Sequence, residues 1–181
     1  MLEAKVIEYY TYEDYRNWEG DWELIGGVPL AMTPSPLLTH QKMATQVAAA
    51  LNDAIEECEE CFVVMEQDWK IDEETVVRPD VVLACDDPGE EHLSKTPEIA
   101  VEIVSPSSAR RDERTKFELY ASEGVRYYLL GYPKDRKFRL WRLENGRYRK
   151  EGDFTGGSYR FDGGHCAFAL DFSRIFSRLK R

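Results

Sequence analysis

The sequence has no long apolar run, no repeated segment and no low-complexity tract, and each absence narrows the class of protein. Its longest apolar stretches, such as 81–84, are far too short for a bilayer, which takes about 20 residues to cross. The segment 1–5 carries an acid at Glu3 and lacks the apolar core of a secretion signal. We therefore expect one domain over residues 1–181, no membrane contact and a cytoplasmic location.

Cysteine is also scarce, with four residues in the chain. Cys58 and Cys61 form one C-x-x-C pair, whereas Cys85 and Cys166 lie far away in sequence. A structural zinc site needs four ligands, and no second C-x-x-C or H-x3-H follows. The sequence predicts reduced cysteines with a structural role rather than metal ligands.

Positive charge is in the minority, since the net charge is -10, which argues against a protein that coats nucleic acid along its length. Residues 126–150 are the exception, with nine Lys or Arg against two Asp or Glu. This local excess could hold a phosphate backbone, or it could coat the solvent side of a strand pair. The sequence leaves both interpretations open.

The hydrophobic pattern alternates between strand and helix periods, which predicts a mixed α/β domain with a central sheet. The Gly26-Gly27 pair between two apolar runs predicts an N-terminal β-hairpin. The four tryptophans are expected in the core and in hairpin contacts. The predicted helices are 11–18, 37–58 and 109–123, with a C-terminal amphipathic segment over 172–179, and the predicted strands are 22–25, 28–32, 62–71, 75–84, 98–104, 125–131, 137–143 and 147–151.

Two acids interrupt the apolar pattern of the central strands. Asp80 shares a strand face with Val82, and Glu102 shares a face with Ala100 and Val104. A buried carboxylate without a partner costs several kcal/mol, so each acid needs a cation, a proton or water. A divalent metal bridging both acids is one answer, with the carbonyl of Ile103 as a third ligand. The alternative is a pair of acids bound to Arg78 or Lys116.

Lys116 favours the metal interpretation. On the predicted helix after the Glu102 strand, Asp112, Lys116 and Tyr120 fall on one face at spacings of four residues. A lysine there can point back over the strand that carries Glu102. It could orient or deprotonate a water, or stabilise a phosphate in the transition state.

These residues form a pattern that resembles a known signature. Arg78-Pro79-Asp80, followed after a gap by Glu102-Ile103-Val104, resembles the PD-(D/E)XK nuclease superfamily. The run Val101 to Ser108 is similar to the bacterial Uma-type family of restriction endonucleases, long described as a domain of unknown function. The match continues with Asp112, Lys116, Tyr120, Gly124-Val125 and Tyr127-Tyr128. The hairpin from Trp22 to Gly27 and His40 at the start of the next helix match the same family, and the resemblance spans roughly residues 10–145.

The resemblance implies a restriction-endonuclease-like fold and a metal-dependent endonuclease that hydrolyses DNA with a metal-activated water. It implies Asp80, Glu102 and Lys116 as catalytic residues, and Asp80, Glu102 and Ile103 as ligands of Mg²⁺, with Mn²⁺ as an alternative ion. Further candidates are Glu23, Asp112 and Tyr120, and His40 as a hydrogen-bonding residue at the helix end. DNA is the expected substrate and a homodimer the expected assembly.

One position departs from the superfamily pattern. Val104 stands where the general motif has lysine, and Lys116 on the helix takes the place of that charge. This departure keeps two rival interpretations open. One is a catalytically silent nuclease fold that acts as a nucleic-acid-binding or regulatory module. The other is a structural subunit whose acids are clamped by Arg78 or Arg111.

Overall fold

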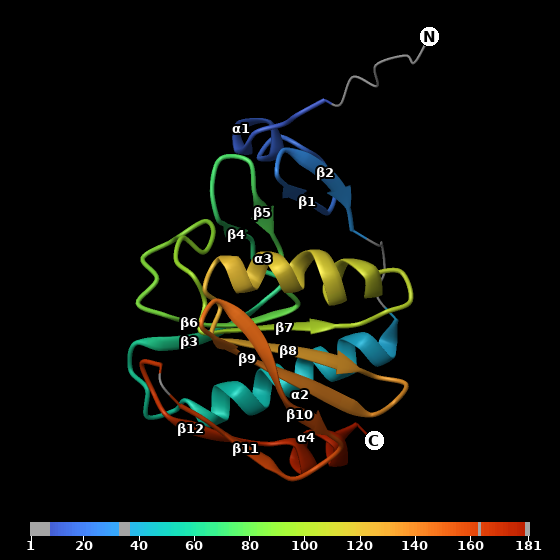
Figure 1. Cartoon of the computed structure of the whole chain (residues 1–181), viewed down its shortest axis with the longest axis vertical. Helices are drawn as coiled ribbons and strands as arrows, with labels where there is room; N and C mark the ends of the chain where they lie inside the picture. The colour runs from blue at the N-terminus through green and yellow to red at the C-terminus, as the bar shows by residue number, and fades with distance from the viewer. Residues whose placement is uncertain (1–7, 33–36, 163, 180–181) are drawn as a thin grey trace.

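The structure, a computed structural model, describes residues 8–32, 37–162 and 164–179. Two layers of helix enclose a central sheet, and a smaller lobe sits at one end of it (Figure 1). The helical segments are α1 (Tyr12–Tyr15), α2 (Leu38–Ala54), the π-helical segment η1 (Arg111–Thr115), α3 (Lys116–Ser122) and α4 (Phe172–Arg178).

The central sheet has six strands in the order β10-β9-β8-β7-β6-β3. Only β7 and β8 pair in parallel within it, so the sheet is mixed, as predicted. A parallel pair needs a crossover connection, which η1 and α3 supply. The strands are β3 (Cys61–Met65), β6 (Val81–Cys85), β7 (Ile99–Ile103), β8 (Tyr127–Tyr132), β9 (Lys137–Glu144) and β10 (Arg147–Phe154).

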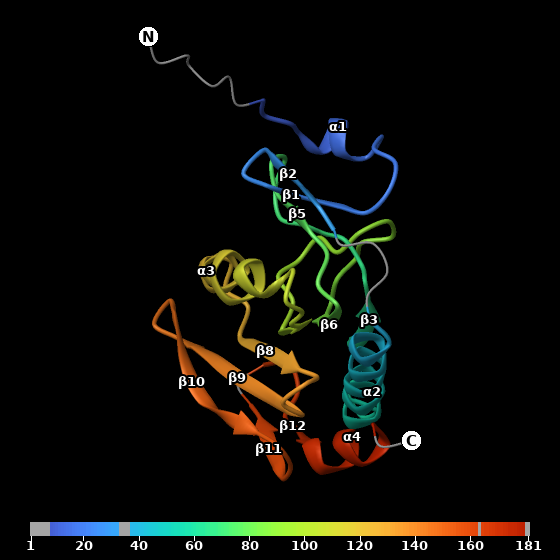
Figure 2. The ribbon, with the colours of Figure 1, turned by 90° about the vertical axis from the view of Figure 1, so that its right-hand side faces the viewer.

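Both faces of this sheet are covered, α2 lying on one side and α3 on the other (Figure 2). Side chains alternate along each strand, so Val81 and Leu83 of β6 join the core under α2, and Val82 joins the core under α3. Met43 and Leu51 of α2 are fully buried in the first core. This double coverage explains the nearly continuous apolar runs of β6 and β7.

The N-terminal lobe contains the predicted hairpin within a four-stranded sheet of order β2-β1-β5-β4. Gly26 and Gly27 both have positive φ, at 56° and 75°, as a type I′ hairpin turn requires. The lobe therefore rests on a local turn that the sequence could specify. Its strands are β1 (Trp22–Ile25), β2 (Val28–Ala31), β4 (Trp69–Lys70) and β5 (Val76–Val77).

Several predicted elements were wrong in extent; the helix over 37–58 ends at Ala54, and the strand over 147–151 continues to Phe154. The strand over 62–71 divides into β3 and β4, and the strand over 75–84 divides into β5 and β6 around Pro79, which has no N–H for the ladder. The helix over 11–18 shortens to α1, and the helix over 109–123 begins as a π-helical turn. The tail forms an unpredicted hairpin of β11 (Ser158–Phe161) and β12 (Phe168–Asp171). Residues 1–5, and a predicted strand break at 33–36, lie outside the described residues.

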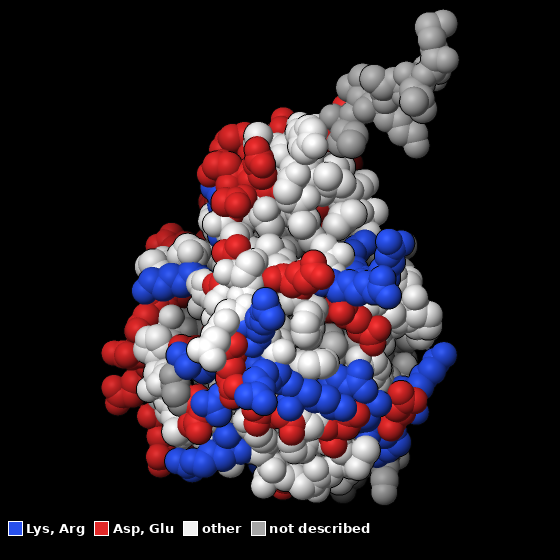
Figure 3. Space-filling view, viewed as in Figure 1, with Lys and Arg blue, Asp and Glu red and all other residues white. Residues whose placement is uncertain are grey.

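The basic stretch 126–150 lies on β8, β9 and β10, where Lys and Arg side chains form a row with acids beside them (Figure 3). Asp153 accepts from Arg139 at 2.8 Å and lies 3.0 Å from Lys150. Arg142 pairs with Asp162 at 3.0 Å, and Arg149 pairs with Glu144 at 3.0 Å. These pairs neutralise much of the local charge, which favours a solvent-facing strand pair over a phosphate-binding surface.

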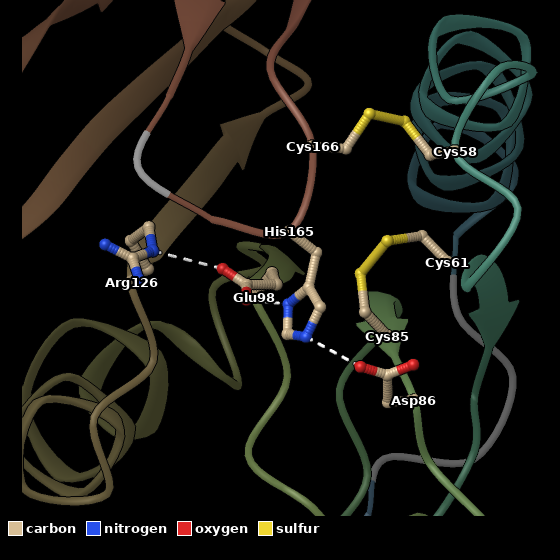
Figure 4. Close-up of a disulfide and its surroundings, with 8 residues drawn as sticks. All are labelled: Cys58, Cys61, Cys85, Asp86, Glu98, Arg126, His165 and Cys166. Carbon is tan, nitrogen blue, oxygen red and sulfur yellow. Dashed lines mark hydrogen bonds and ion pairs between the residues drawn. A yellow bond between two sulfur atoms is a disulfide. The ribbon is translucent and has the colours of Figure 1, made fainter.

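The prediction of reduced cysteines was wrong, because all four are paired in two disulfides close to each other (Figure 4). Cys61 and Cys85 are direct cross-strand partners in β3 and β6. Cys58, just beyond α2, joins Cys166 in the loop between β11 and β12. Such bonds are typical of oxidising compartments or of intracellular proteins from hyperthermophiles, so the cysteines no longer support the cytoplasmic expectation.

A charged cluster lies beside the disulfides. His165, next to Cys166, contacts Glu98 through Nδ1 and Asp86 through Nε2, each at 2.8 Å (Figure 4). The hydrogen bond to Glu98 and the nearby carboxylates raise the pKa of His165. The loop that carries Cys166 is therefore fixed by ion pairs to residues that flank β6 and β7, and by the disulfide to the segment after α2.

None of the helices in the described ranges is long and apolar enough to cross a membrane.

The disulfides should contribute unequally to stability. The Cys58–Cys166 bond closes a loop with a sequence separation of 108, against 24 for Cys61–Cys85. Chain-entropy arguments give roughly 4–5 kcal/mol for the longer loop and about 3 kcal/mol for the shorter one. We expect the Cys58→Ala/Cys166→Ala variant to lose more free energy of unfolding in guanidinium than Cys61→Ala/Cys85→Ala. Equal losses of unfolding free energy in the two variants would contradict the expected order. A wild-type stability that a reductant leaves unchanged would contradict the presence of the disulfides.

Candidate active site

A cavity of about 460 Å³ opens where the N-terminal lobe meets the end of the central sheet. β1 and the segment after β5 form one wall, β7 forms the floor, and the starts of α2 and η1 close the sides. Its lining includes six carboxylates but only three permanent cations, Arg78, Arg111 and Lys116. The cavity therefore carries an excess of negative charge.

A buried lysine stands at the centre of the site. Lys116, the first residue of α3, places Nζ 2.7 Å from Oε1 of Glu23 and 2.8 Å from Oε1 of Glu102. Tyr120, one turn further along α3, donates its hydroxyl to the same Glu102 oxygen at 2.8 Å. All four residues are at most 3% exposed. Both contacts of Glu102 use Oε1, so Oε2 takes part in neither.

Asp80 lies one strand away from Glu102 and is bound to the backbone of the Glu102 strand. Its Oδ2 accepts the N–H of Ile103 at 2.6 Å and lies 3.2 Å from Nε2 of His40. In an extended strand the N–H and C=O of one residue point to the same edge, so the Ile103 carbonyl is directed toward the side where Asp80 lies. Asp80, Ile103 and Glu102 thus line the same cavity.

Asp112 and Arg111 enter the site from the π-helical segment. Arg111 donates to Oε2 of Glu23 at 3.2 Å and to the carbonyl of Ala31 at 3.3 Å. Asp112 is 3% exposed, and its carbonyl accepts the Tyr128 hydroxyl at 2.9 Å. π-Helical turns often occur at functional sites. Here the turn places both an acid and an arginine at the cavity.

Burial and mutual repulsion shift the ionisation of these acids. Burial, followed by the charges of Asp112 and Asp80, raises the pKa of Glu102 well above its ordinary value, although Lys116 opposes the shift. Burial raises the pKa of Asp112 to about 6, again against Lys116. The available cations therefore do not compensate the carboxylates fully.

The pKa values of Lys116 and His40, the two basic groups beside these acids, are raised. Burial alone would lower the pKa of Lys116, but Glu102 and Glu23 outweigh it and raise that pKa. For His40, burial also opposes protonation, and the hydrogen bond and charge of Asp80 raise the pKa. Nδ1 of His40 is buried without a hydrogen-bond partner among the described residues.

The donor set fits a hard divalent cation with few protein ligands. Within residues 8–32, 37–162 and 164–179, no three side chains of His, Cys, Asp and Glu are grouped as a metal cage. Magnesium often needs only one or two carboxylates and completes its shell with water and substrate phosphate. Asp80, Glu102 and the Ile103 carbonyl provide such a partial set, and the uncompensated carboxylates would favour a cation there.

The residues singled out from the sequence converge on this cavity. Tyr120 lies behind Glu102 and donates to it. The cavity lining contains the other seven: Glu23, His40, Asp80, Glu102, Ile103, Asp112 and Lys116. Arg78 and Arg111 do not clamp Asp80 or Glu102, because their side chains bind Asp21, Asp68, Glu23 and the Ala31 carbonyl. The structural-subunit interpretation therefore lacks its arginine clamp. Glu102 is nevertheless paired with Lys116 at 2.8 Å, as the alternative to a bridging metal expected.

Sequence reasoning missed two contributors to the site. Ser108 hydrogen-bonds to Asp112, and Tyr128 holds the backbone of Asp112 from β8. Ser108 was quoted only as the end of the motif run Val101 to Ser108, and its spacing of four residues before Asp112 was the available signal. Tyr128 belongs to the residue pattern that resembles the family but was given no role, because its contact depends on how η1 packs on the sheet.

The chain is similar to known proteins in both sequence and fold. Residues 7–159 match the model of the Uma2 family, described as "Putative restriction endonuclease". Five chains of solved structures match, including the crystal structure of a putative nuclease belonging to DUF820 from Anabaena variabilis. That chain is 16% identical, with a TM-score of 0.74 over 93% of this chain and 98% of its own. No curated protein matches.

At this identity the structural match carries the fold alone, which is a nuclease-type mixed sheet flanked by helices. The family match covers far more than half of the 181 residues. The chain therefore belongs to the Uma2 family of putative restriction endonucleases.

Proposed function

We propose that this protein is a metal-dependent endodeoxyribonuclease of the PD-(D/E)XK type. Asp80, Glu102 and the Ile103 carbonyl would hold Mg²⁺, or Mn²⁺ in its place. The observation that carries the proposal is the convergence of two carboxylates from adjacent strands with a buried lysine in one cavity. The family description supports a nucleic acid as substrate.

The bound ion would act as a Lewis acid and lower the pKa of a coordinated water. Lys116 would supply a fixed positive charge toward the reacting phosphate. Because Glu102 and Glu23 raise its pKa, it is unsuited to act as a general base. Glu23 and Arg111 would position Lys116, and His40 would orient the Asp80 carboxylate.

The absence of an in-strand lysine is compatible with this assignment. Val104 occupies the position of that lysine, and the 2.8 Å contact between Lys116 and Glu102 restores a cation beside the same carboxylate. A lysine from the helix can take the place of a lysine from the strand, provided that its ammonium group lies on the same side of the site.

The alternative is a catalytically silent nuclease fold that binds or regulates nucleic acid. The net charge of -10 and the paired basic residues of β9 and β10 favour it, because both weaken general attraction to DNA. Metal binding and strand cleavage separate the two functions. A homodimer would set two sites against the two strands of a duplex, and we include that assembly in the proposal.

Loss of either metal-binding carboxylate should abolish turnover. We expect Asp80→Asn and Glu102→Gln to remove Mg²⁺ and Mn²⁺ binding in calorimetry and to reduce nicking of supercoiled plasmid by roughly 100-fold or more. Glu98→Gln is a matched control, because Glu98 is partly buried and pairs with Arg126 just before the start of β7, outside the cavity lining. Absence of metal binding by the folded wild type at millimolar concentration would leave the silent-fold alternative.

Removal of Lys116 should destabilise the fold as well as the site. Lys116→Met leaves Glu102 buried without its cation and leaves Glu23 with Arg111 alone, and breaking such a buried pair typically costs about 3–5 kcal/mol. Lys137→Met, which removes a partly buried lysine 3.9 Å from Asp153, should cost less than about 1 kcal/mol. Urea unfolding measures both variants, and similar losses for the two would argue against the buried pairing.

Asp112 should make the protein less stable as pH rises, whereas most carboxylates in folded proteins have the opposite effect. Its folded pKa of about 6 exceeds the ordinary value of 3.8, so the folded state holds this proton more tightly than the unfolded state does. The contribution of Asp112 to the free energy of unfolding therefore falls as pH rises from about 4 to about 6. Asp112→Asn should remove this part of the slope in metal-free urea titrations.

Asp153→Asn provides the opposite control for that experiment. The hydrogen bond from Arg139, with help from Lys150, lowers the pKa of Asp153. Asp153 therefore stabilises the fold above the unfolded pKa, and this contribution disappears as pH falls. A wild-type slope that Asp112→Asn leaves unchanged would exclude the assigned ionisation of Asp112.

A further inference from the structure

A second cavity, of about 300 Å³, lies in the N-terminal lobe beside the candidate active site. Aromatic rings form half of its lining, from Tyr12, Tyr15, Trp18, Trp22 and His92. The tryptophans were expected in the core and in hairpin contacts. Trp69 meets that expectation at 2% exposure, whereas Trp18 and Trp22 are only half-buried.

The rings of this cavity are held in place by one another. Trp18 meets Tyr15 with centroids 5.6 Å apart and Trp22 with centroids 5.7 Å apart, both edge to face. Tyr12 meets His92 in the same manner at 5.4 Å. Rings fixed by such contacts present ready-made faces, so a flat ligand could stack without a large ordering cost.

Arg78 connects this cavity to the candidate active site, because it lines both. Nε of Arg78 donates to Asp68 at 2.6 Å in the aromatic cavity, and Nη1 donates to Asp21 at 2.7 Å in the active-site cavity. Its backbone N–H donates to Oε1 of Glu23 at 2.9 Å. Asp80 follows two residues later in the chain. The two cavities are therefore contiguous across a single fixed side chain.

We infer that the aromatic cavity binds a nucleobase of the strand whose phosphodiester occupies the active-site cavity. This inference rests on the proposed function and extends it to the substrate. A nucleotide crossing Arg78 would place its phosphate toward Asp80 and Glu102 and its base among the rings. Base–aromatic stacking is tolerant of sequence, and the polar rim of Arg16, Glu91 and His92 offers groups for the base edge.

A cationic ligand fits this cavity less well, although aromatic rings with acids often bind cations. Both oxygens of Asp68 are already used, by Arg78 and by the Tyr15 hydroxyl at 2.9 Å. Nζ of Lys70 already lies 4.2 Å from the centroid of the Tyr12 ring. Arg16 and Arg78 balance the two acids of the lining, Asp68 and Glu91. The cavity therefore has no excess of negative charge to attract a cation, and a neutral aromatic ligand fits it better.

The experiment compares a nucleotide with its base-free counterpart on the intact protein. Deoxyadenosine 5′-monophosphate and 2-deoxyribose 5-phosphate are titrated in EDTA, with tryptophan fluorescence as the readout. We expect the nucleotide to bind at least roughly tenfold more tightly and to quench the fluorescence, since a stacked base contributes on that order. Equal affinities for the two compounds would overturn the inference.

A variant pair locates the binding. Trp18→Leu should weaken nucleotide binding by roughly tenfold and leave the affinity for deoxyribose phosphate unchanged. Trp141→Leu is the matched control, because Trp141 is also half-buried but packs on Phe117 at the far side of α3. Wild-type affinity in a folded Trp18→Leu variant, shown by circular dichroism, would overturn the location.

The design separates this inference from the proposed function. Nucleotide binding in EDTA requires no metal and no cleavage, so it can succeed where the nuclease assay fails. A second substrate, an oligodeoxynucleotide with one abasic position moved along the strand, tests the connection between the cavities. Cleavage reduced when the abasic position flanks the cut, and not elsewhere, is expected. Cleavage indifferent to every abasic position would reject the base pocket while the nuclease assignment stood.

Discussion

The architecture depends on one buried ammonium group held between two carboxylates from different sheets. Lys116 on α3 binds Glu23 of the N-terminal lobe and Glu102 of the central sheet. A charge left unpaired in this environment would cost several kcal/mol, so the lobe, the sheet and the helix must meet in a definite arrangement. The active-site cavity lies where they meet. The same contact thus positions the lobe and creates the electrostatic environment of the site.

Much of the fold follows from local patterns in the sequence. The glycine pair specified the first hairpin, and the apolar stripe of α2 and the runs of β6 and β7 were strong enough to locate these elements. The failures have particular causes. Glu66 adopts a positive φ of 50° between β3 and β4, and a glutamate gives no sequence signal for such a turn. The extra residue per turn in η1 has no sequence signal, and the β11–β12 hairpin depends on packing against α2 and α4.

The residues of the cavity were easier to single out from the sequence than the contacts that hold them in place. Acids in apolar strands stand out because burial makes them costly, and this signal was enough to select Asp80 and Glu102. The partners of Lys116 were less accessible, since Glu23 is 93 positions before it in sequence. The cysteines failed for the same reason: Cys58 and Cys166 become neighbours only through the placement of the C-terminal hairpin. The aromatic cavity likewise depends on which faces of Trp18 and Trp22 the fold leaves uncovered.

The hydrogen bond from the Ile103 N–H gives Asp80 a structural role that is independent of catalysis. Pro79 ends the strand ladder, and the Asp80 side chain accepts the backbone N–H that a further strand residue would otherwise have bound. An asparagine could accept the same bond without the charge. Selection for folding and selection for turnover would therefore leave different residues at this position. Among relatives, an aspartate here would point to a working site, and an asparagine would mark a lineage that kept the scaffold and gave up the reaction.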